Sequence, residues 1–122
     1  MQRMTKVGVV SQRVIDLLNL TITAGTPIYI GESNISHMLQ SHPGDYQKYK
    51  EQIPNIIEQP DYVGLNPSDN SLEYIKLFVI DNESVKVAVR VSHGGKLYVR
   101  TLYARDLQKM ERFVKKGYLL KY

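Results

Sequence analysis

The spacing of apolar residues changes along the chain, from a helical period in the first half to a strict alternation in the second. Apolar residues recur at helical spacing in three early segments, which predicts amphipathic helices there. These segments are 12–18, 33–42 and 43–51, and Ile56 and Ile57 continue the third after a kink or restart at Pro54. Pro43 separates the second from the third, because the residue before a proline avoids the helical region and a proline suits a first helical turn. Ser33 or Asn34 is expected to cap the second helix.

Alternation follows a turn-rich segment at 61–70. Apolar and polar side chains then alternate in three runs, as in strands with one buried face. The runs are 73–80, 85–92 and 97–103, and shorter extended pieces are expected at 6–10, 27–30 and 62–63. A last helix is expected to begin at Asp106 and to end at Gly117. The pattern predicts an α+β fold, with N-terminal helices packed on an antiparallel β-meander sheet and a C-terminal helix.

The same alternation sorts the residues of the sheet onto two faces. The valines of the middle run share the face that is expected to pack on the helices; they are Val85, Val87, Val89 and Val91. The other face holds Lys86 and Arg90, and it is expected to add Lys96, Tyr98 and Arg100 from the third run. Because cations bind phosphate and tyrosine stacks on unpaired bases, Lys86, Lys96 and Tyr98 are candidate RNA-binding residues. An ordinary solvated outer face remains the alternative.

Length and composition limit the possible classes. The 122 residues predict a single domain, 1–122, with 43% apolar residues. No apolar run reaches the length of a membrane span, and the charged N-terminus lacks the apolar stretch of a signal peptide. Cysteine is absent, which excludes disulfides, thiol nucleophiles and cysteine-bound zinc. A cytoplasmic protein without membrane association is therefore expected.

The net charge of +4 is unevenly distributed. Residues 1–73 hold 5 Lys and Arg against 8 Asp and Glu, whereas residues 74–122 hold 11 against 4. The strand-rich half therefore carries a balance of +7. RNA is the first partner that such a basic surface suggests, and an acidic protein that mimics RNA fits it as well.

Two of the three histidines lie close together, at the break between the second and third helices. Histidine exchanges protons near neutral pH, so His37 and His42 are candidate acids or bases. Five helical residues separate their directions by about 140°, which excludes the zinc motif that needs two histidines four residues apart. His37 is expected on the polar side of its helix, whereas His42 beside Pro43 also suits a capping or packing role. His93 lies in a glycine turn and is expected to be exposed.

Cleavage of RNA without a metal needs a base for the 2′-hydroxyl, an acid for the departing 5′-oxygen, and cations for the phosphorane. His37 or His42 would move the proton, and which of them does so stays open. The partners expected on the late strands are Arg90, Arg100, Thr101 and Tyr103. The product would be a 2′,3′-cyclic phosphate. No serine elbow or phosphate loop is present, and no metal or cofactor is expected.

These positions also belong to a longer pattern. It runs His37-x4-His42-Pro43-x-Asp45-Tyr46-x2-Tyr49, then Ile56-Ile57-x2-Pro60-Asp61-Tyr62-Val63-Gly64, then Val87-x2-Arg90 and Leu97-Tyr98-Val99-x-Thr101-Leu102-Tyr103. Over about residues 28–116 it resembles the phage- and mobile-element-associated nucleases of the Barnase–EndoU–colicin–RelE (BECR) superfamily. The resemblance implies helices followed by a four-stranded antiparallel sheet, metal-independent RNA cleavage, and a toxin or conflict role with an immunity partner.

Within that superfamily, branches like the colicin D tRNase pair a histidine near the first helices with a hydroxyl residue on a late strand. The resemblance would place His37 or His42 with Thr101 in these roles, with Tyr103 as the nearby aromatic residue. The glutamate base of barnase-like branches has no evident counterpart in the sequence, which leaves the choice of base open.

The sequence thus predicts a metal-independent endoribonuclease of toxin or phage-conflict type, acting on tRNA or other structured RNA. An immunity or antitoxin protein is the expected protein partner. A module that binds RNA or protein without catalysis, through the same basic sheet, is the alternative. A third reading is an accessory protein of a phage or mobile element that acts through a protein contact.

Overall fold

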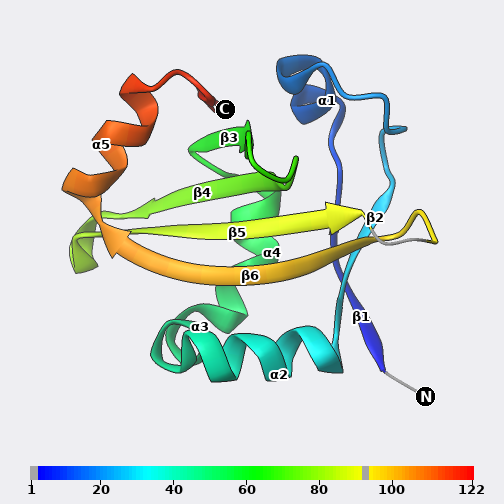
Figure 1. Ribbon diagram of the computed structural model, residues 1–122, viewed down its shortest axis with the longest axis horizontal. Helices are drawn as coiled ribbons and strands as arrows, with labels where there is room; N and C mark the ends of the chain where they lie inside the picture. Colours follow the sequence, from blue (N-terminus) through cyan, green and yellow to red (C-terminus); the bar gives the residue numbers. More distant parts are fainter. Residues whose placement is uncertain (1–2, 92–93) are drawn as a thin grey trace.

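Residues 3–91 and 94–122, which the computed structural model describes, form an α+β fold around one mixed sheet of seven strands (Figure 1). The strands are β1 (Met4–Val9), β2 (Pro27–Gly31), β3 (Tyr62–Leu65), β4 (Leu72–Phe78), β5 (Glu83–Val91), β6 (Leu97–Asp106) and β7 (Leu119–Lys121). The α-helices are α1 (Gln12–Leu18), α2 (Glu32–Ser41), α3 (Pro43–Tyr49), α4 (Ile53–Glu58) and α5 (Leu107–Lys115), and two short 3-10 helices are η1 (Lys50–Gln52) and η2 (Val79–Asp81). The predicted fold class is confirmed.

The strand order is β1-β2-β6-β5-β4-β3-β7. Neighbouring strands are antiparallel except β2 and β6, which run parallel. The predicted meander forms the centre of the sheet as β4, β5 and β6. The sheet is larger than the four strands that the resemblance implied, because β1 and β2 extend it on one side and β7 on the other.

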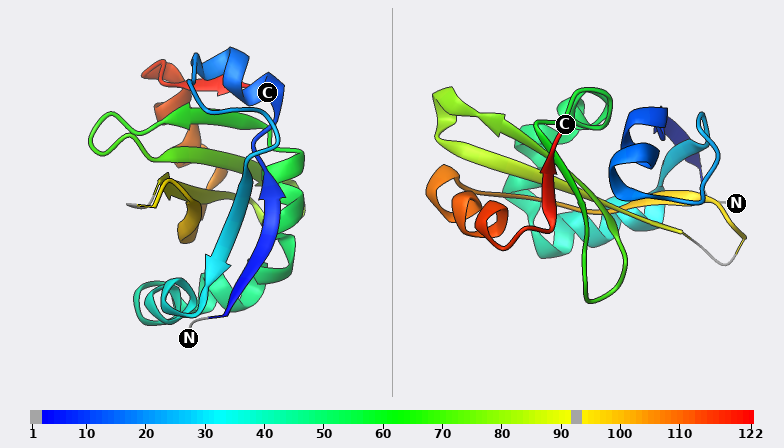
Figure 2. Two further views of the ribbon diagram at one scale, coloured as in Figure 1. Left: turned by 90° about the vertical axis from the view of Figure 1, so that its right-hand side faces the viewer. Right: turned by 90° about the horizontal axis from the view of Figure 1, so that it is seen from above.

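Helices pack on both faces of the sheet, but unequally (Figure 2). The main core lies between β4–β6 and the helices α2, α3 and α4. Its fully buried side chains include Met38, Ile56, Val87, Val99 and Leu102. On the opposite face, α5 covers one end of the sheet through a second, smaller cluster, which contains Ile75, Met110 and Leu119. We call the face of β4, β5 and β6 on which α5 lies the open face, since α5 covers only one end of it (Figure 2).

Local signals predicted most element boundaries correctly. Ser11 caps α1, and its Oγ accepts a hydrogen bond from the Val14 amide at 3.2 Å. Asp106 directly precedes α5, and Gly117 after it has a φ of +85°. The predicted cap of α2 was wrong: the helix begins at Glu32, and Asn34 lies inside the first turn, where its side chain accepts from the Gly31 amide at 2.9 Å.

The predicted core face of β5 holds for Val85, Val87 and Val89, which are fully buried. Val91 departs from it with 60% exposure, because it lies at the strand end, where helices no longer cover the sheet. Ser92 and His93 lie outside the described residues, so the exposure expected for His93 stays a prediction. None of the described helices is both long and apolar enough to cross a bilayer.

A bulge in β6 overturns the predicted alternation of that strand. Ala88 pairs with Thr101 and Val89 pairs with Val99, so Arg100 is an extra residue between them. The bulge reverses the facing of every later residue. Leu102 is therefore fully buried in the core, although simple alternation placed it on the same face as Arg100.

Candidate active site

The open face is bordered on several sides. α5 covers the end where β6 finishes, and α2 and α3 run along β6 (Figure 1). The loop 66–71 between β3 and β4 projects from the sheet on the same side as α5 (Figure 2). Because of the bulge, Thr101 and Tyr103 lie on this face, on the strand next to Lys86 and Ala88. We call the part of the open face between these borders the floor. Its side chains form the candidate active site.

His42 reaches the site from the break between α2 and α3. Pro43 begins α3, and His42 leaves helical geometry with φ −143° and ψ 63°. Both of its backbone polar groups are hydrogen-bonded: its amide donates to the Met38 carbonyl at 2.8 Å, and its carbonyl accepts from the Tyr46 amide at 3.0 Å. The half-buried imidazole lies 5.4 Å from the Tyr103 ring, centroid to centroid. The residue expected at a helix junction is therefore also the histidine that contacts a predicted partner.

Three side chains of α3 tie this junction to the sheet. The Asp45 carboxylate accepts from the Ala104 amide of β6 at 3.0 Å. Lys48 and Tyr49 both donate to Glu83 Oε1 of β5, at 2.8 and 2.7 Å. The hydrogen bonds from Lys48 and Tyr49 lower the pKa of Glu83, while burial and Glu83 raise the pKa of Tyr49 to about 12. These contacts hold His42 in place beside β6.

A buried ion pair occupies the floor next to Tyr103. Lys86 Nζ lies 3.1 Å from Glu73 Oε2, and the two side chains are only 11% and 3% exposed. Lys86 Nζ also lies 5.2 Å from the centroid of the Tyr103 ring. Burial acts to lower the pKa of Lys86, but Tyr103 and Glu73 outweigh it, so the pKa is raised and the ammonium stays charged. Lys86 is thus a buried, fixed cation and not the exposed one that alternation predicted.

Sequence reasoning missed Glu73 and Tyr118. Among the described residues, Glu73 Oε1 is buried without a hydrogen-bond partner. Burial raises the pKa of Tyr118; the charge of Lys86 opposes this rise and Glu73 adds to it. Only the strand register reveals the role of Glu73: Ile75 pairs with Lys86 and Glu73 with Ala88, so Glu73 and Lys86 are diagonal neighbours. Tyr118 had no such signal, because β7 was not predicted.

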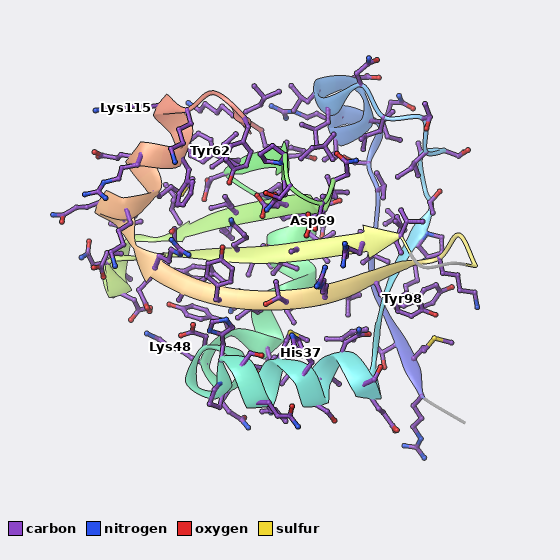
Figure 3. All side chains as sticks on the ribbon, viewed as in Figure 1. His37, Lys48, Tyr62, Asp69, Tyr98 and Lys115 are labelled. Carbon is purple, nitrogen blue, oxygen red and sulfur yellow. The ribbon has the colours of Figure 1, made fainter. Side chains whose placement is uncertain are left out.

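Arg100 crosses the floor from the bulge. Its guanidinium lies 3.6 Å from Asp69 Oδ2 in the loop 66–71, which lies beyond β5 in the strand order. Figure 3 shows Asp69 on this loop. Hydrogen bonds from Ser71, and then the charge of Arg100, lower the pKa of Asp69. A bulge re-aims a side chain in this way, and it gives Arg100 the reach to contact a phosphate on the open face.

The remaining predicted residues lie apart from His42. Tyr98 lies near the far end of β6 (Figure 3), where its ring is 6.2 Å from Tyr29 and its hydroxyl contacts Met4 Sδ at 2.8 Å. Lys96 Nζ is 5.9 Å from the Tyr29 ring, and Arg90, which is exposed, pairs with Tyr98 across the strands. The residues Arg90, Lys96 and Tyr98 thus form a second group, which we call the distal group.

His37 is exposed on α2, the helix that runs along β6 (Figure 3). The structure therefore brings His42, Tyr103, Thr101 and Lys86 onto one floor, with Arg100 reaching over it. It does not bring His37 or the distal group into contact with Tyr103. Within residues 3–91 and 94–122, no three His, Asp or Glu side chains are grouped as metal ligands. A proton-exchanging ring, hydroxyls and fixed cations on one surface suit chemistry on a phosphodiester.

Comparison with known families agrees with this chemistry. The sequence model of the phage-Barnase-EndoU-ColicinE5/D-RelE like nuclease 3 family (PBECR3) matches residues 5–112 of the chain. The protein belongs to this nuclease family, and the resemblance found from its motifs is confirmed. The match also includes β1 and α1, which lie before the motifs. No curated protein and no solved structure matches the chain significantly.

Proposed function

We propose that this nuclease is a metal-independent endoribonuclease whose centre is His42 and Tyr103 on the open face. The observation that carries the proposal is the 5.4 Å contact of these two rings beside the buried Lys86–Glu73 pair. It supports an active centre because a proton-exchanging ring, a hydroxyl and a cation held by a carboxylate meet on the open face, where His42 and Tyr103 are only partly buried. Family membership supports the nuclease class independently.

In the proposed reaction the 2′-oxygen attacks the adjacent phosphorus and the bond from phosphorus to the 5′-oxygen breaks. His42 accepts the 2′-hydroxyl proton, and Tyr103 donates a proton to the departing 5′-oxygen. The products are a 2′,3′-cyclic phosphate and a 5′-hydroxyl. Lys86 and Arg100 stabilise the negative charge that develops on the phosphorane. Thr101 donates a hydrogen bond to a phosphate oxygen, and Glu73 positions Lys86.

We propose tRNA or another structured RNA as the substrate, and a toxin or phage-conflict role with an immunity protein as partner. The basic half of the chain supports a polyanionic substrate. An acidic immunity protein would occupy the same cationic face, since it would have to present the charge pattern of RNA.

Purified protein incubated with total tRNA in EDTA tests the reaction. We expect cleavage that leaves 2′,3′-cyclic phosphate ends and a loss of about 10²–10⁴-fold in rate for His42→Ala. His37→Ala serves as the matched control, because it removes an exposed histidine from the neighbouring helix; its rate should stay within a few-fold of wild type. The reverse result would move the proton chemistry to His37.

The same assay addresses the non-catalytic alternative, which the exposed cations of the open face favour. Binding of tRNA with a steep salt dependence, without cleavage in any variant, would identify a binding module. Absence of both cleavage and binding would refute an RNA-directed function and favour a protein contact.

A further inference from the structure

A further group of cations lies on the open face, where β6 meets α5. Arg105 Cζ is 4.9 Å from the centroid of the Tyr103 ring and 5.5 Å from that of Phe113. Lys116 Nζ and Lys86 Nζ lie 5.6 and 5.3 Å from the same Phe113 ring. Three cations, from β5, from β6 and from the residue after α5, thus lie around one aromatic side chain. Cations gathered around one ring raise the local positive potential, which favours the binding of an anion beside them.

The charges of this group are not balanced within the protein. Lys86 is paired with Glu73. In the part of the chain that the structure describes, neither Arg105 nor Lys116 forms an ion pair with a carboxylate. Two cations therefore remain available on this part of the open face.

The helix dipole does not explain the position of Arg105. Arg112 and Lys115 lie in the last turn of α5, where cations offset the negative end of the helix. Arg105 lies just before the first turn, at the positive end, where a cation is disfavoured. Stacking on Tyr103 and Phe113 holds it there, which is the arrangement expected if its guanidinium serves a ligand.

Helical spacing extends the positive surface along α5. Lys109 and Lys116 are two turns apart, and Arg112 lies between them on the same side, next to Phe113. Lys115 lies about 90° around the helix from the middle of this stripe. A chain of phosphates leaving Arg105 would therefore continue past basic side chains.

The group adjoins the proposed reaction centre. The Tyr103 ring contacts His42 and Arg105, so a phosphate at the guanidinium would be the neighbour of one held at His42. Beside the guanidinium lies a pocket of about 20 Å³, whose lining includes Ser84, Lys86, Tyr103 and Arg105. This volume admits a single oxygen-sized group, so it suits a phosphate oxygen and excludes a base.

We propose that Arg105 and Lys116 form a second phosphate site, which binds the phosphate next to the scissile one and guides the RNA strand along α5. The site rests on the proposed ribonuclease function and deepens it: the substrate must supply at least two consecutive backbone phosphates.

The test compares substrates of two lengths in the variant Arg105→Gln/Lys116→Gln. A dinucleoside monophosphate has only the scissile phosphate, so wild type and variant should cleave it with the same kcat/KM. A pentanucleotide supplies the second phosphate, and the variant should lose about 10-fold or more in kcat/KM, mainly through KM. The matched control is Lys50→Gln/Lys115→Gln, which removes two cations elsewhere and should cleave both substrates like wild type. Thermal melting verifies that both variants fold.

Equal losses on both substrates, or the same loss in the control, would overturn the second phosphate site. A binding titration separates this failure from failure of the enzymatic proposal. In the His42→Ala background, the pentanucleotide should bind with a log Kd against log salt slope that falls by about 1–2 when Arg105 and Lys116 are replaced. A fall in slope without cleavage by the wild type would retain the phosphate site and refute the enzyme; an unchanged slope would refute the site.

Discussion

The two ends of the open face carry similar residue types in opposite environments. Near α5, Lys86 is buried against Glu73 and lies beside Tyr103. At the other end, Arg90 and Lys96 of the distal group are exposed, near the end of β5 and just before β6. Both ends thus combine tyrosine with basic side chains, and burial is what separates them.

This difference indicates different roles. A cation that burial and a carboxylate hold in one position is suited to stabilising a transition state, because no reorganisation is needed when the charge develops. An exposed cation loses rotamer freedom on binding, and it adapts to ligands of varied shape. The end near α5 therefore has the properties of a reaction centre, and the distal group those of a binding surface.

The largest effect is expected from Lys86→Ala. Removing the ammonium leaves Glu73 buried without its partner, which should cost about 3–5 kcal/mol of unfolding free energy. Arg90→Ala, on the same strand and face but exposed, should change it by less than about 0.5 kcal/mol. Urea unfolding measures both. Equal, small changes in the two unfolding free energies would show that burial does not hold Lys86. The contrast between the two ends of the open face would then be wrong.

The double variant Glu73→Leu/Lys86→Met sharpens this test. Replacing a buried pair by apolar residues of similar size is often neutral for stability, so most of the unfolding free energy should return. RNA cleavage should nevertheless stay lost, because the fixed cation is absent. Recovery of activity with stability would show that the pair has a structural role alone.

A smaller effect is expected at Gly64, whose close approach to β7 supports the buried end. A Cβ there would lie 2.6 Å from the Tyr118 carbonyl oxygen. Gly64→Ala should therefore destabilise the protein by about 1–3 kcal/mol and displace Tyr118 from Glu73. Gly44→Ala is the control, since no atom outside its own helical turn lies within 4 Å of the new methyl group. Its melting temperature should match or exceed that of wild type.

At the distal group, Tyr98→Ala should weaken RNA binding by about 1 kcal/mol through lost stacking on a base. The kcat for a dinucleoside monophosphate should not change, because Tyr98 lies away from Tyr103 on β6. Fluorescence titration and single-turnover kinetics separate the two quantities. A large fall in kcat would place the distal group within the reaction centre.

The smallest effect concerns pH and the attachment of α3. The pKa of Glu83 is lowered in the folded state by its bonds to Lys48 and Tyr49. The contribution of Glu83 to the stability of the fold is therefore present above its pKa in the unfolded chain. This contribution is lost as the pH falls through its pKa in the folded protein. The difference in unfolding free energy between wild type and Glu83→Gln should shrink between neutral and acid pH. A difference that is independent of pH would contradict this linkage.

Much of the fold follows from local signals that the sequence displays. The helix after Ser11, the break at Pro43 and the stop at Gly117 each follow from the conformational preference of one residue. The core face of β5 follows from a period of two. The family motifs, moreover, indicated a nuclease before any contact was known.

The site was less predictable because its parts depend on pairing between strands. Arg100 lies in a bulge that no glycine or proline marks, and burial of Leu102 on the core side is what selects it. Glu73 and Lys86 become partners only through the β4–β5 register. β7 is too short to show a period of its own, so its contact with β3 was not predicted.

Local periodicity and turn chemistry thus sufficed to predict the elements and the faces of the middle strand, because each depends on neighbours within a few residues. The family was predicted from motifs that are spread along most of the chain. The choice of His42 over His37 as the histidine beside Tyr103, and the turning of Thr101 and Tyr103 onto the open face, required the folded sheet. Both depend on contacts between residues that are tens of positions apart, where packing decides which side chains meet.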